Sequence, residues 1–348
     1  MDANTIPSFP FTLPTSWQGT SWEHQGTLMT ANSNVVTTSG SNCHSNSATS
    51  HPAHSVHDSV NSLPNEILAD IFALVAGSYS SLETHNGLWK AILVCRRWKE
   101  VCESTPTLWA TVSIDSHSAC GFSPDSISRL IDTIMTRSYT CGLHLILRSL
   151  PDSIEPNFDH ILNLLLAHSH RWETVDLLIL GYVSSLKIPP NTLFPRLRSF
   201  TFATASQFNV CIPITHLITS HSPALRRLSL SGASLHLPCL EGDGLSEVEE
   251  LTLNVSDWCA ETVFSVLQAM PRLKSCTLVP CGMSAATLST DRVPLSYLQS
   301  LELRTMDEAL VKTYLQRLHC PSLRTVSSPC LASQNTSMSA IVSSLIST

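Results

Sequence analysis

One cysteine and four histidines between residues 43 and 57 have the chemistry of a functional site. Thiolate and imidazole groups are common zinc ligands, so a cluster of them would indicate a metal site. The last three histidines recur every third residue, no zinc-finger spacing occurs, and the surrounding chain is rich in Ser, Thr and Asn. We therefore expect no metal site and no cofactor. The residues are Cys43, His44, His51, His54 and His57.

Known catalytic patterns are missing from the sequence. It has no Walker loop, no GxGxxG, no GxSxG, no HExxH and no CxxC pair, which are the arrangements that hold phosphates, nucleophiles and metals in enzymes. The 15 histidines are spread along the chain. Those near apolar segments are expected to pack or to lie at the surface, and they are His144, His168, His170 and His216. We expect a protein that is not an enzyme.

The composition narrows the class of partner. The formal net charge is −7 and only 14% of residues are charged, so no general attraction to nucleic acid or to an anionic membrane is expected. No apolar run approaches the roughly 20 residues of a membrane-spanning helix. The first basic residue is Lys90, so we expect neither a secretory signal nor a mitochondrial presequence. The 12 cysteines are scattered, which favours a reduced protein of the cytoplasm, the nucleus or both.

The amino-acid composition and pattern change twice along the chain. Residues 1–60 are dominated by Ser, Thr and Asn and contain no Lys or Arg. Such a segment buries too little apolar surface to offset its chain entropy, so it is predicted to be disordered. We expect a helical module over residues 61–112 and a repeat region over residues 113–348.

Two helices are predicted in the helical module. Pro64 suits the first turn of the first helix, because its missing N–H would have no partner there anyway. Apolar residues then recur at helical spacing as far as Val75, and Gly77 is a plausible stop. A second helix is predicted over residues 88–105, where Pro106 ends it. A strand is predicted over residues 108–114.

An internal repeat follows. Its pattern is apolar-x-x-apolar-x-apolar, and successive copies begin 23 to 28 residues apart. Four copies have a proline two residues before the first apolar position. The copies begin at Trp172, Leu197, Leu225, Val248, Leu273, Leu298 and Leu323, with looser ones at Trp109 and Leu143.

Helix-like stretches lie between these copies. One of them, residues 123–138, has Ser123 as a cap and Pro124 in its first turn. Strand and helix alternating at a period near 25 residues predict a right-handed α/β solenoid, with parallel strands on the concave face and helices outside. The expected fold is therefore a small helical module followed by an α/β solenoid.

The helical module resembles the F-box family, in the variant common in fungal proteins. That family carries Leu-Pro and Ile-Leu pairs on its first helix, a Val-Cys-Arg-x-Trp signature on its last, and then Pro-x-Leu-Trp. Here these elements are Leu63-Pro64, Ile67-Leu68, Val94 to Trp98, and Pro106 to Trp109. The repeat region resembles the irregular leucine-rich repeats often found behind an F-box, which form a horseshoe. It lacks the Asn that usually follows each strand.

The resemblance implies docking on a Skp-type adaptor and, through it, on a cullin–RING ubiquitin ligase, with the chain as its substrate receptor. The residues that would form or support the adaptor contact are Leu63, Pro64, Ile67, Leu68, Ile71, Val94, Cys95 and Trp98. Phe72 and Trp98 are alternatively core residues of the module. Two further alternatives remain open. One is a scaffold that binds the adaptor without promoting ubiquitination, and the other is a repeat scaffold whose first helix is only a cap.

A protein substrate, of a class that the sequence does not identify, would meet the concave face. The candidate residues there are Arg198, Arg226, Arg227, Glu249, Lys274 and Arg304. Corresponding positions of successive strands form a charged row that is mixed in sign: Arg198, Arg226, Glu249, Lys274, Gln299 and Arg324. The alternative is that opposite charges in this row simply pair with each other in water. The Arg226-Arg227 pair is the best candidate for binding an anion.

Overall fold

The structure is a computed structural model of the chain, and it describes the residue ranges given at the end of this paragraph. The tail over residues 1–60, its Cys and His residues, Gly77 and His216 lie outside the described residues. The chain divides into two units, Met1–Leu68 and Ala69–Thr348. The described residues are 62–76, 81–82, 87–149, 157–179, 188–189, 192–204, 222–232, 245–254, 260–279, 292–305 and 307–329.

The two predicted helices of the module differ from the structure in one respect. The first predicted helix is confirmed as α2 (Asn65–Ala76), but the second is broken at Cys95 into α3 (Gly87–Val94) and α4 (Arg96–Ser104). Cys95 itself is extended, with φ −159° and ψ 167°. The stretch contains no Pro or internal Gly to mark the break. The break allows α3 and α4 to pack on each other, a tertiary effect that overrides the continuous apolar period.

The strand predicted over residues 108–114 also begins later than expected. Pro106 opens a 3₁₀ turn, η2 (Pro106–Trp109), and the strand β1 is Thr111–Asp115. The Trp109 indole N–H donates to the Cys102 carbonyl at 2.7 Å. This bond holds the tryptophan in the core as part of η2 and leaves the strand to start after it.

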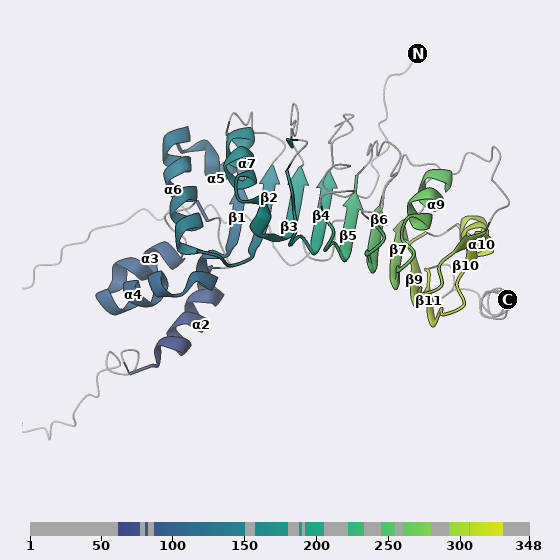
Figure 1. The fold of residues 1–348 in the computed structure, drawn as a ribbon, viewed down its shortest axis with the longest axis horizontal. Coiled ribbons are helices and arrows are strands. Elements are labelled where there is room, and N and C mark those ends of the chain that lie inside the picture. Colours follow the sequence, from purple (N-terminus) through teal and green to yellow (C-terminus); the bar gives the residue numbers. More distant parts are fainter. Residues whose placement is uncertain are drawn as a thin grey trace, which may run out of the picture. The chain divides into compact units, whose positions relative to one another are not determined.

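The repeat region forms one sheet of nine strands, in which the strands are parallel and follow chain order (Figure 1). Its apolar positions are in register across the sheet, so that Val112 stands beside Leu145 and Phe200 beside Leu228. The predicted strands of the repeat are therefore confirmed. The strands after β1 are β2 (Leu143–Ser149), β3 (Trp172–Ile179), β4 (Ser199–Thr204), β5 (Arg227–Ser231), β6 (Glu250–Asn254), β7 (Ser275–Val279), β9 (Ser300–Leu303) and β11 (Thr325–Ser327).

A four-residue turn precedes most strands and explains the repeated proline. In each, the amide of the first apolar position donates to the carbonyl three residues earlier, as Leu197 does to Phe194 at 3.2 Å. The proline therefore occupies the second position of a β-turn, where its fixed φ fits the turn. The prolines at this position are Pro195, Pro223, Pro271 and Pro321.

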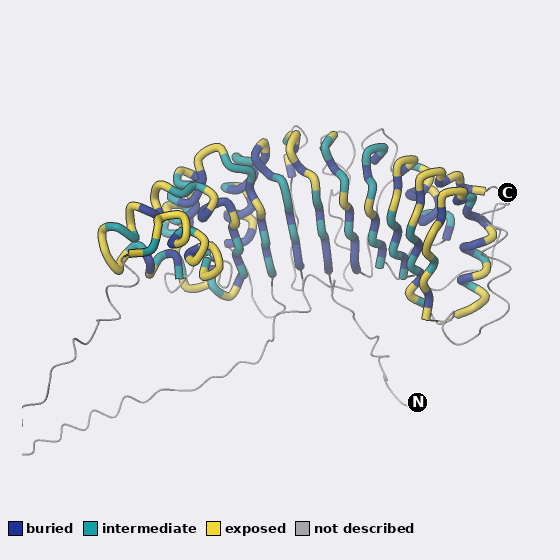
Figure 2. The backbone as a smooth tube through the Cα atoms, turned by 90° about the horizontal axis from the view of Figure 1, so that it is seen from below, coloured by how far each residue is buried: buried dark blue, intermediate teal, exposed yellow. Residues whose placement is uncertain are grey.

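Helices at both ends of the sheet cover its apolar face. Ser123 caps α6 (Pro124–Arg137) as predicted, because its hydroxyl accepts from the Ser126 amide at 3.3 Å. Along the strands, buried positions alternate with less buried ones (Figure 2). Among the described residues, the opposite face of the sheet, the open face, therefore carries the less buried and mainly polar side chains. The other elements are α5 (Ser116–Cys120), α7 (Phe158–Leu166), η3 (Ser169–Arg171), α9 (Ala260–Gln268), α10 (Glu308–Arg317) and a small parallel pair, β8 (Val293–Pro294) with β10 (Leu318–His319).

Candidate protein-docking surfaces

Helix α2 presents an apolar stripe to solvent. Ile67, Ile71, Leu74 and Val75 follow one another at intervals of four, three and one residues, which places them along one side of a helix. All four are exposed, and Leu74 keeps 78% of its surface. Leaving aliphatic side chains in water forgoes roughly 1.5–3 kcal/mol each. A stripe of this kind is typical of a surface that a partner protein covers.

A second exposed apolar site lies where α3 meets α4. Leu93 and Val94 end α3 with 82% and 59% of their surfaces exposed. Cys95 follows in the extended conformation and is exposed as well. The break between the two helices therefore turns three apolar side chains toward solvent.

The structure separates the eight predicted adaptor residues into three groups. Leu68 is buried, with 1% of its surface exposed, and belongs to the core. Leu63 and Trp98 are half-buried, and the Trp98 ring lies 5.0 Å from that of the buried Phe72, so Trp98 supports the module from within. The exposed residues are Pro64, Ile67, Ile71, Val94 and Cys95.

Sequence reasoning missed three exposed apolar residues of the module. Leu74 and Val75 continue the stripe of Ile67 and Ile71 by one more turn, so the same helical period would have found them. Leu93 carries no such signal, because its exposure depends on the break at Cys95.

The module is joined to the repeat region through aromatic side chains. The Trp89 and Trp109 rings are 5.2 Å apart in an edge-to-face arrangement, and the Trp89 indole N–H donates to the Ser81 carbonyl at 3.0 Å. From α6, the Arg137 guanidinium lies over both rings and pairs with Glu103 of α4 at 2.9 Å. Within the unit Ala69–Thr348, these contacts therefore tie α4 and the two tryptophans to α6 of the first repeat.

The charged row predicted from the sequence lies at the start of successive strands. The Arg226 amide donates to the Arg198 carbonyl at 2.9 Å, and the Glu249 amide donates to the Arg226 carbonyl at 2.8 Å. The same bond continues through Lys274, Gln299 and Arg324. These residues therefore do occupy corresponding positions, while their role in substrate binding stays a prediction.

Most charges of this row have partners of opposite sign. Arg226 lies 3.2 Å from Glu247 and 3.9 Å from Glu249, and Lys274 lies 2.7 Å from Glu249. The hydrogen bond from Lys274 holds the pKa of the Glu249 carboxyl below its usual range. The alternative of mutual pairing therefore describes this part of the row, and Arg226 is not a free anion-binding group.

The remaining candidates lie on the open face or beside it. Arg304 pairs with Glu302 at 2.8 Å, and this hydrogen bond lowers the pKa of Glu302. Arg227 is exposed and stands in register with Ser199 and Glu250. The row that crosses the middle of the open face carries mainly hydroxyl groups, and it includes Ser113, Thr201, Ser229, Thr252, Thr277 and Ser327.

Charged side chains interrupt this hydroxyl-rich face near its first strands. Arg148 stands in register with Asp115. Burial raises the pKa of Asp176 and lowers that of Arg148. The attraction between the two opposite charges works against both of these shifts. A peptide crossing this face would meet hydroxyl groups and balanced charges, a surface suited to hydrogen bonding.

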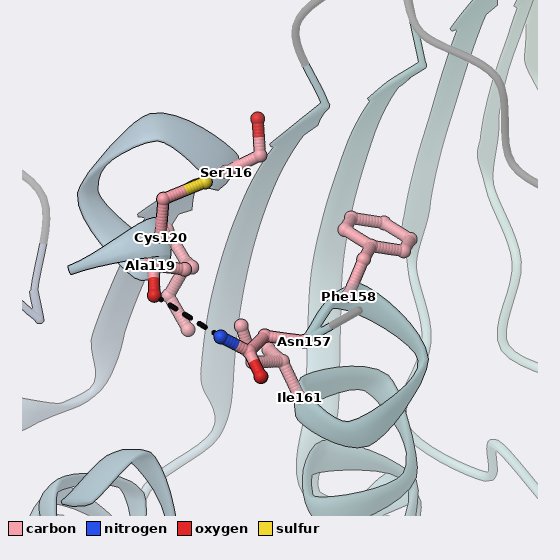
Figure 3. Close-up of a pocket in the computed structure, with 7 residues that line it drawn as sticks. Ser116, Ala119, Cys120, Asn157, Phe158 and Ile161 are labelled. Carbon is pink, nitrogen blue, oxygen red and sulfur yellow. Dashed lines mark hydrogen bonds between the residues drawn. The ribbon is translucent and has the colours of Figure 1, made fainter. Parts of the chain in front are cut away.

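A small cavity between α5 and α7 is not a ligand site. The Asn157 side chain reaches across it and donates to the Ala119 carbonyl at 3.2 Å (Figure 3). Its volume of about 10 Å³ has room for about one water molecule. The bond adds to the one that the Phe122 amide donates to the same carbonyl at 3.2 Å, and so it ties Asn157 to the end of α5.

Comparison with known families agrees with this geometry. The family model described as F-box-like matches residues 60–115, which contain α2, α3, α4, η2 and β1. The chain carries an F-box-like domain. F-box domains generally bind Skp-type adaptors, and the exposed stripe of α2 and the α3–α4 junction lie inside the matched residues. No curated protein sequence matches the chain.

Two further findings concern only the described residues. None of their helices has both the length and the apolar character needed to cross a membrane. In the same part of the chain, no three side chains among His, Cys, Asp and Glu gather closely enough to hold a metal ion.

Proposed function

We propose that the chain is the substrate-recognition subunit of an SCF-type ubiquitin ligase. In this function the F-box-like domain docks on a Skp-type adaptor, which connects it to a cullin–RING ligase, and the chain itself performs no catalysis. The ligase acts on a substrate because the receptor raises its local concentration beside the ubiquitin-carrying enzyme. We place this activity in the cytoplasm, the nucleus or both.

One observation carries the docking half of the proposal. Nine large apolar side chains are exposed in the described residues, and six of them belong to α2 and α3. These six lie within the residues matched by the F-box-like model. A surface with so concentrated an apolar character favours a protein partner. The six are Ile67, Ile71, Leu74, Val75, Leu93 and Val94.

The receptor half rests on the repeat region. Its strands follow chain order in one parallel sheet, and a turn of the same kind introduces most of them. We propose that this region is an irregular leucine-rich-repeat-like solenoid of residues 113–348, and that a protein substrate binds its open face. A row of hydroxyl groups and Arg227, whose side chain is exposed, would supply hydrogen bonds to that substrate.

A scaffold function is the alternative, in which the chain binds the adaptor without promoting ubiquitination. The paired charges along the strands favour it in one respect, because a face whose charges neutralise each other has little electrostatic selectivity. Affinity purification of the complex separates the two. Recovery of both adaptor and cullin supports the receptor, whereas recovery of the adaptor alone supports the scaffold.

The docking surface is tested by charge substitution on exposed residues. Ile71→Asp with Leu74→Asp should abolish co-purification with a Skp-type adaptor, because two carboxylates would have to be desolvated in an apolar interface. Both side chains are exposed, so the variant should fold. Leu193→Asp with Tyr297→Asp is the matched control, since these exposed apolar residues lie in the repeat region. If the α2 variant folds and still binds the adaptor, the docking surface is assigned wrongly.

A further inference from the structure

A wide hollow opens at the edge of the sheet where β3 and β4 begin. Its volume is about 950 Å³, within the range of sites that bind small molecules or peptide segments. It lies between the C-terminal turns of α6, the η3 turn and the residues that lead into β4. None of the surfaces assigned to adaptor or substrate uses these residues.

The walls of this hollow carry more basic than acidic side chains. Among the described residues they carry Arg171, Arg196, His168 and His170, against one carboxylate, that of Asp132. Aliphatic surface from Met135 and Pro195 completes the lining. Cationic groups beside apolar surface are suited to an anion that is part of a larger organic ligand.

Arg171 is the fixed charge of the site. It is buried and donates to the carbonyls of Cys141 and Met135 at 3.1 and 3.2 Å and to the Ser138 hydroxyl at 2.6 Å. These bonds give partners to oxygen atoms at the C-terminal end of α6 and just after it, but they bring no negative charge close to Arg171. In the part of the chain that is described, Arg171 has no carboxylate partner within 4.0 Å.

The basic groups of the hollow oppose one another's protonation. Burial lowers the pKa of Arg171, and the nearby Arg196 guanidinium lowers it further. Burial also lowers the pKa of His168, and Arg171 and His170 add to this effect. The Asp132 carboxylate raises the pKa of His168, but its effect is the smallest of the four. An anion bound among these groups would relieve the repulsion.

Tyr139 adds an independent observation at the rim. Its φ is 49°, and it is the one residue other than glycine with a positive φ in the described ranges. It stands directly after the α6 cap, where glycine is the favoured residue. The residue is 73% exposed, so burial does not compensate the strain. A strained residue that presents an exposed ring beside a charged hollow indicates a ligand contact.

We propose that this hollow binds an anionic group, phosphate or carboxylate, carried by a protein segment. Arg196 and His170, both exposed, would donate to the anion, and the Tyr139 ring would lie against the adjoining chain. A protein ligand is favoured over nucleic acid or an anionic membrane because the whole chain has a net charge of −7. The proposal does not depend on adaptor docking.

Titration of the full chain with inorganic phosphate tests the site, followed by a phosphoserine peptide and a glutamate-rich peptide of matched length. Proton NMR of the histidine rings should show the His168 signals moving with phosphate, and the pKa of His168 rising. Arg196→Ala should weaken peptide binding at least about tenfold, the effect of losing one charge-assisted hydrogen bond. Arg272→Ala removes an exposed arginine that likewise follows a turn proline but lies outside the hollow, and it should have no effect.

Comparison of the two peptides identifies whether a phosphate or a carboxylate supplies the anion. Tighter binding of the phosphopeptide supports phosphate, and equal binding of both supports a general acidic segment. The proposal is overturned if phosphate leaves the His168 signals in place, or if Arg272→Ala weakens binding as much as Arg196→Ala. Tighter binding of an oligonucleotide than of either peptide would also overturn it. Because no adaptor takes part, these outcomes are independent of the test of adaptor docking.

Discussion

The guanidinium carbon of Arg137 lies 4.5 Å from the centre of the Trp109 ring, which joins the last turn of α6 to the tryptophan that ends the F-box-like helices. The same guanidinium lies 5.6 Å from the Trp89 ring and binds Glu103 at 2.9 Å. One side chain of the repeat region therefore contacts three residues of the F-box-like domain.

Arg137→Ala should lower the free energy of unfolding by about 2 kcal/mol, because it removes two cation–π contacts and an ion pair from a partly buried position. Chemical denaturation followed by tryptophan fluorescence measures this change. Arg96→Ala is the matched control. Arg96 also forms an ion pair, with Glu100, but its side chain is 92% exposed, so its loss should cost less than about 0.5 kcal/mol. Equal effects of the two substitutions would contradict the role of Arg137.

Alanine substitution of two neighbouring residues of α2 should have opposite effects on stability and on adaptor binding. Leu68→Ala should destabilise the chain by about 2–5 kcal/mol, because the side chain is buried and would leave a cavity. Ile67→Ala should change stability by about 0.5 kcal/mol or less but should weaken adaptor binding. Thermal unfolding together with an adaptor pull-down checks both. A stable Leu68→Ala variant that has lost adaptor binding would place Leu68 in the interface instead of the core.

The sequence was sufficient to predict the strands after β1, because the same apolar pattern recurs from one strand to the next. Val175, Phe200 and Leu228 occupy corresponding positions in the pattern and stand side by side in the sheet. The alignment of Arg198 with Arg226 follows from the same period. Local periodicity fixes such relationships, since every repeat meets a neighbour of the same geometry.

Contacts between dissimilar elements were not predictable in this way. The position of Arg137 over two tryptophans depends on how α6 meets η2, and the hollow depends on how α6 meets η3. The break at Cys95 likewise follows from the packing of α3 on α4 and has no local sequence signal. These features arise from long-range packing, which no local pattern of the sequence specifies.

Stability should fall on acidification through His168. Its pKa in the folded chain lies below the ordinary value of 6.5, so between these values the unfolded chain binds more protons and unfolding becomes easier as the pH drops. His168→Gln should therefore lose less stability than the wild type between about pH 7 and about pH 5. Denaturation midpoints across this range measure the difference, with His117→Gln, an exposed histidine of α5, as the control. Parallel curves for wild type and His168→Gln would contradict the prediction.

Tyr139→Gly should stabilise the fold while weakening the proposed anion site. Glycine adopts a positive φ without the steric cost of a side chain, so a gain of about 1 kcal/mol is expected. Thermal unfolding measures the gain, and the phosphopeptide titration measures the loss. Tyr297→Gly is the control, because this exposed tyrosine has no positive φ and its replacement should bring no gain. A gain in stability without any loss of peptide binding would show that the Tyr139 ring contacts no ligand.

Ser296→Pro should stabilise the repeat region. Ser296 holds the second position of the turn that runs from Leu295 to Leu298, whose closing hydrogen bond is 3.1 Å long. Pro195 and Pro271 hold that position in other copies, so the backbone there already suits proline. Proline at a compatible site restricts the unfolded chain and should add about 0.4–1 kcal/mol. Ser296→Ala is the control, because alanine lacks the ring constraint, and it should change the free energy of unfolding by close to zero in the same denaturation experiment. A loss of stability with proline would mean that this turn differs from its counterparts.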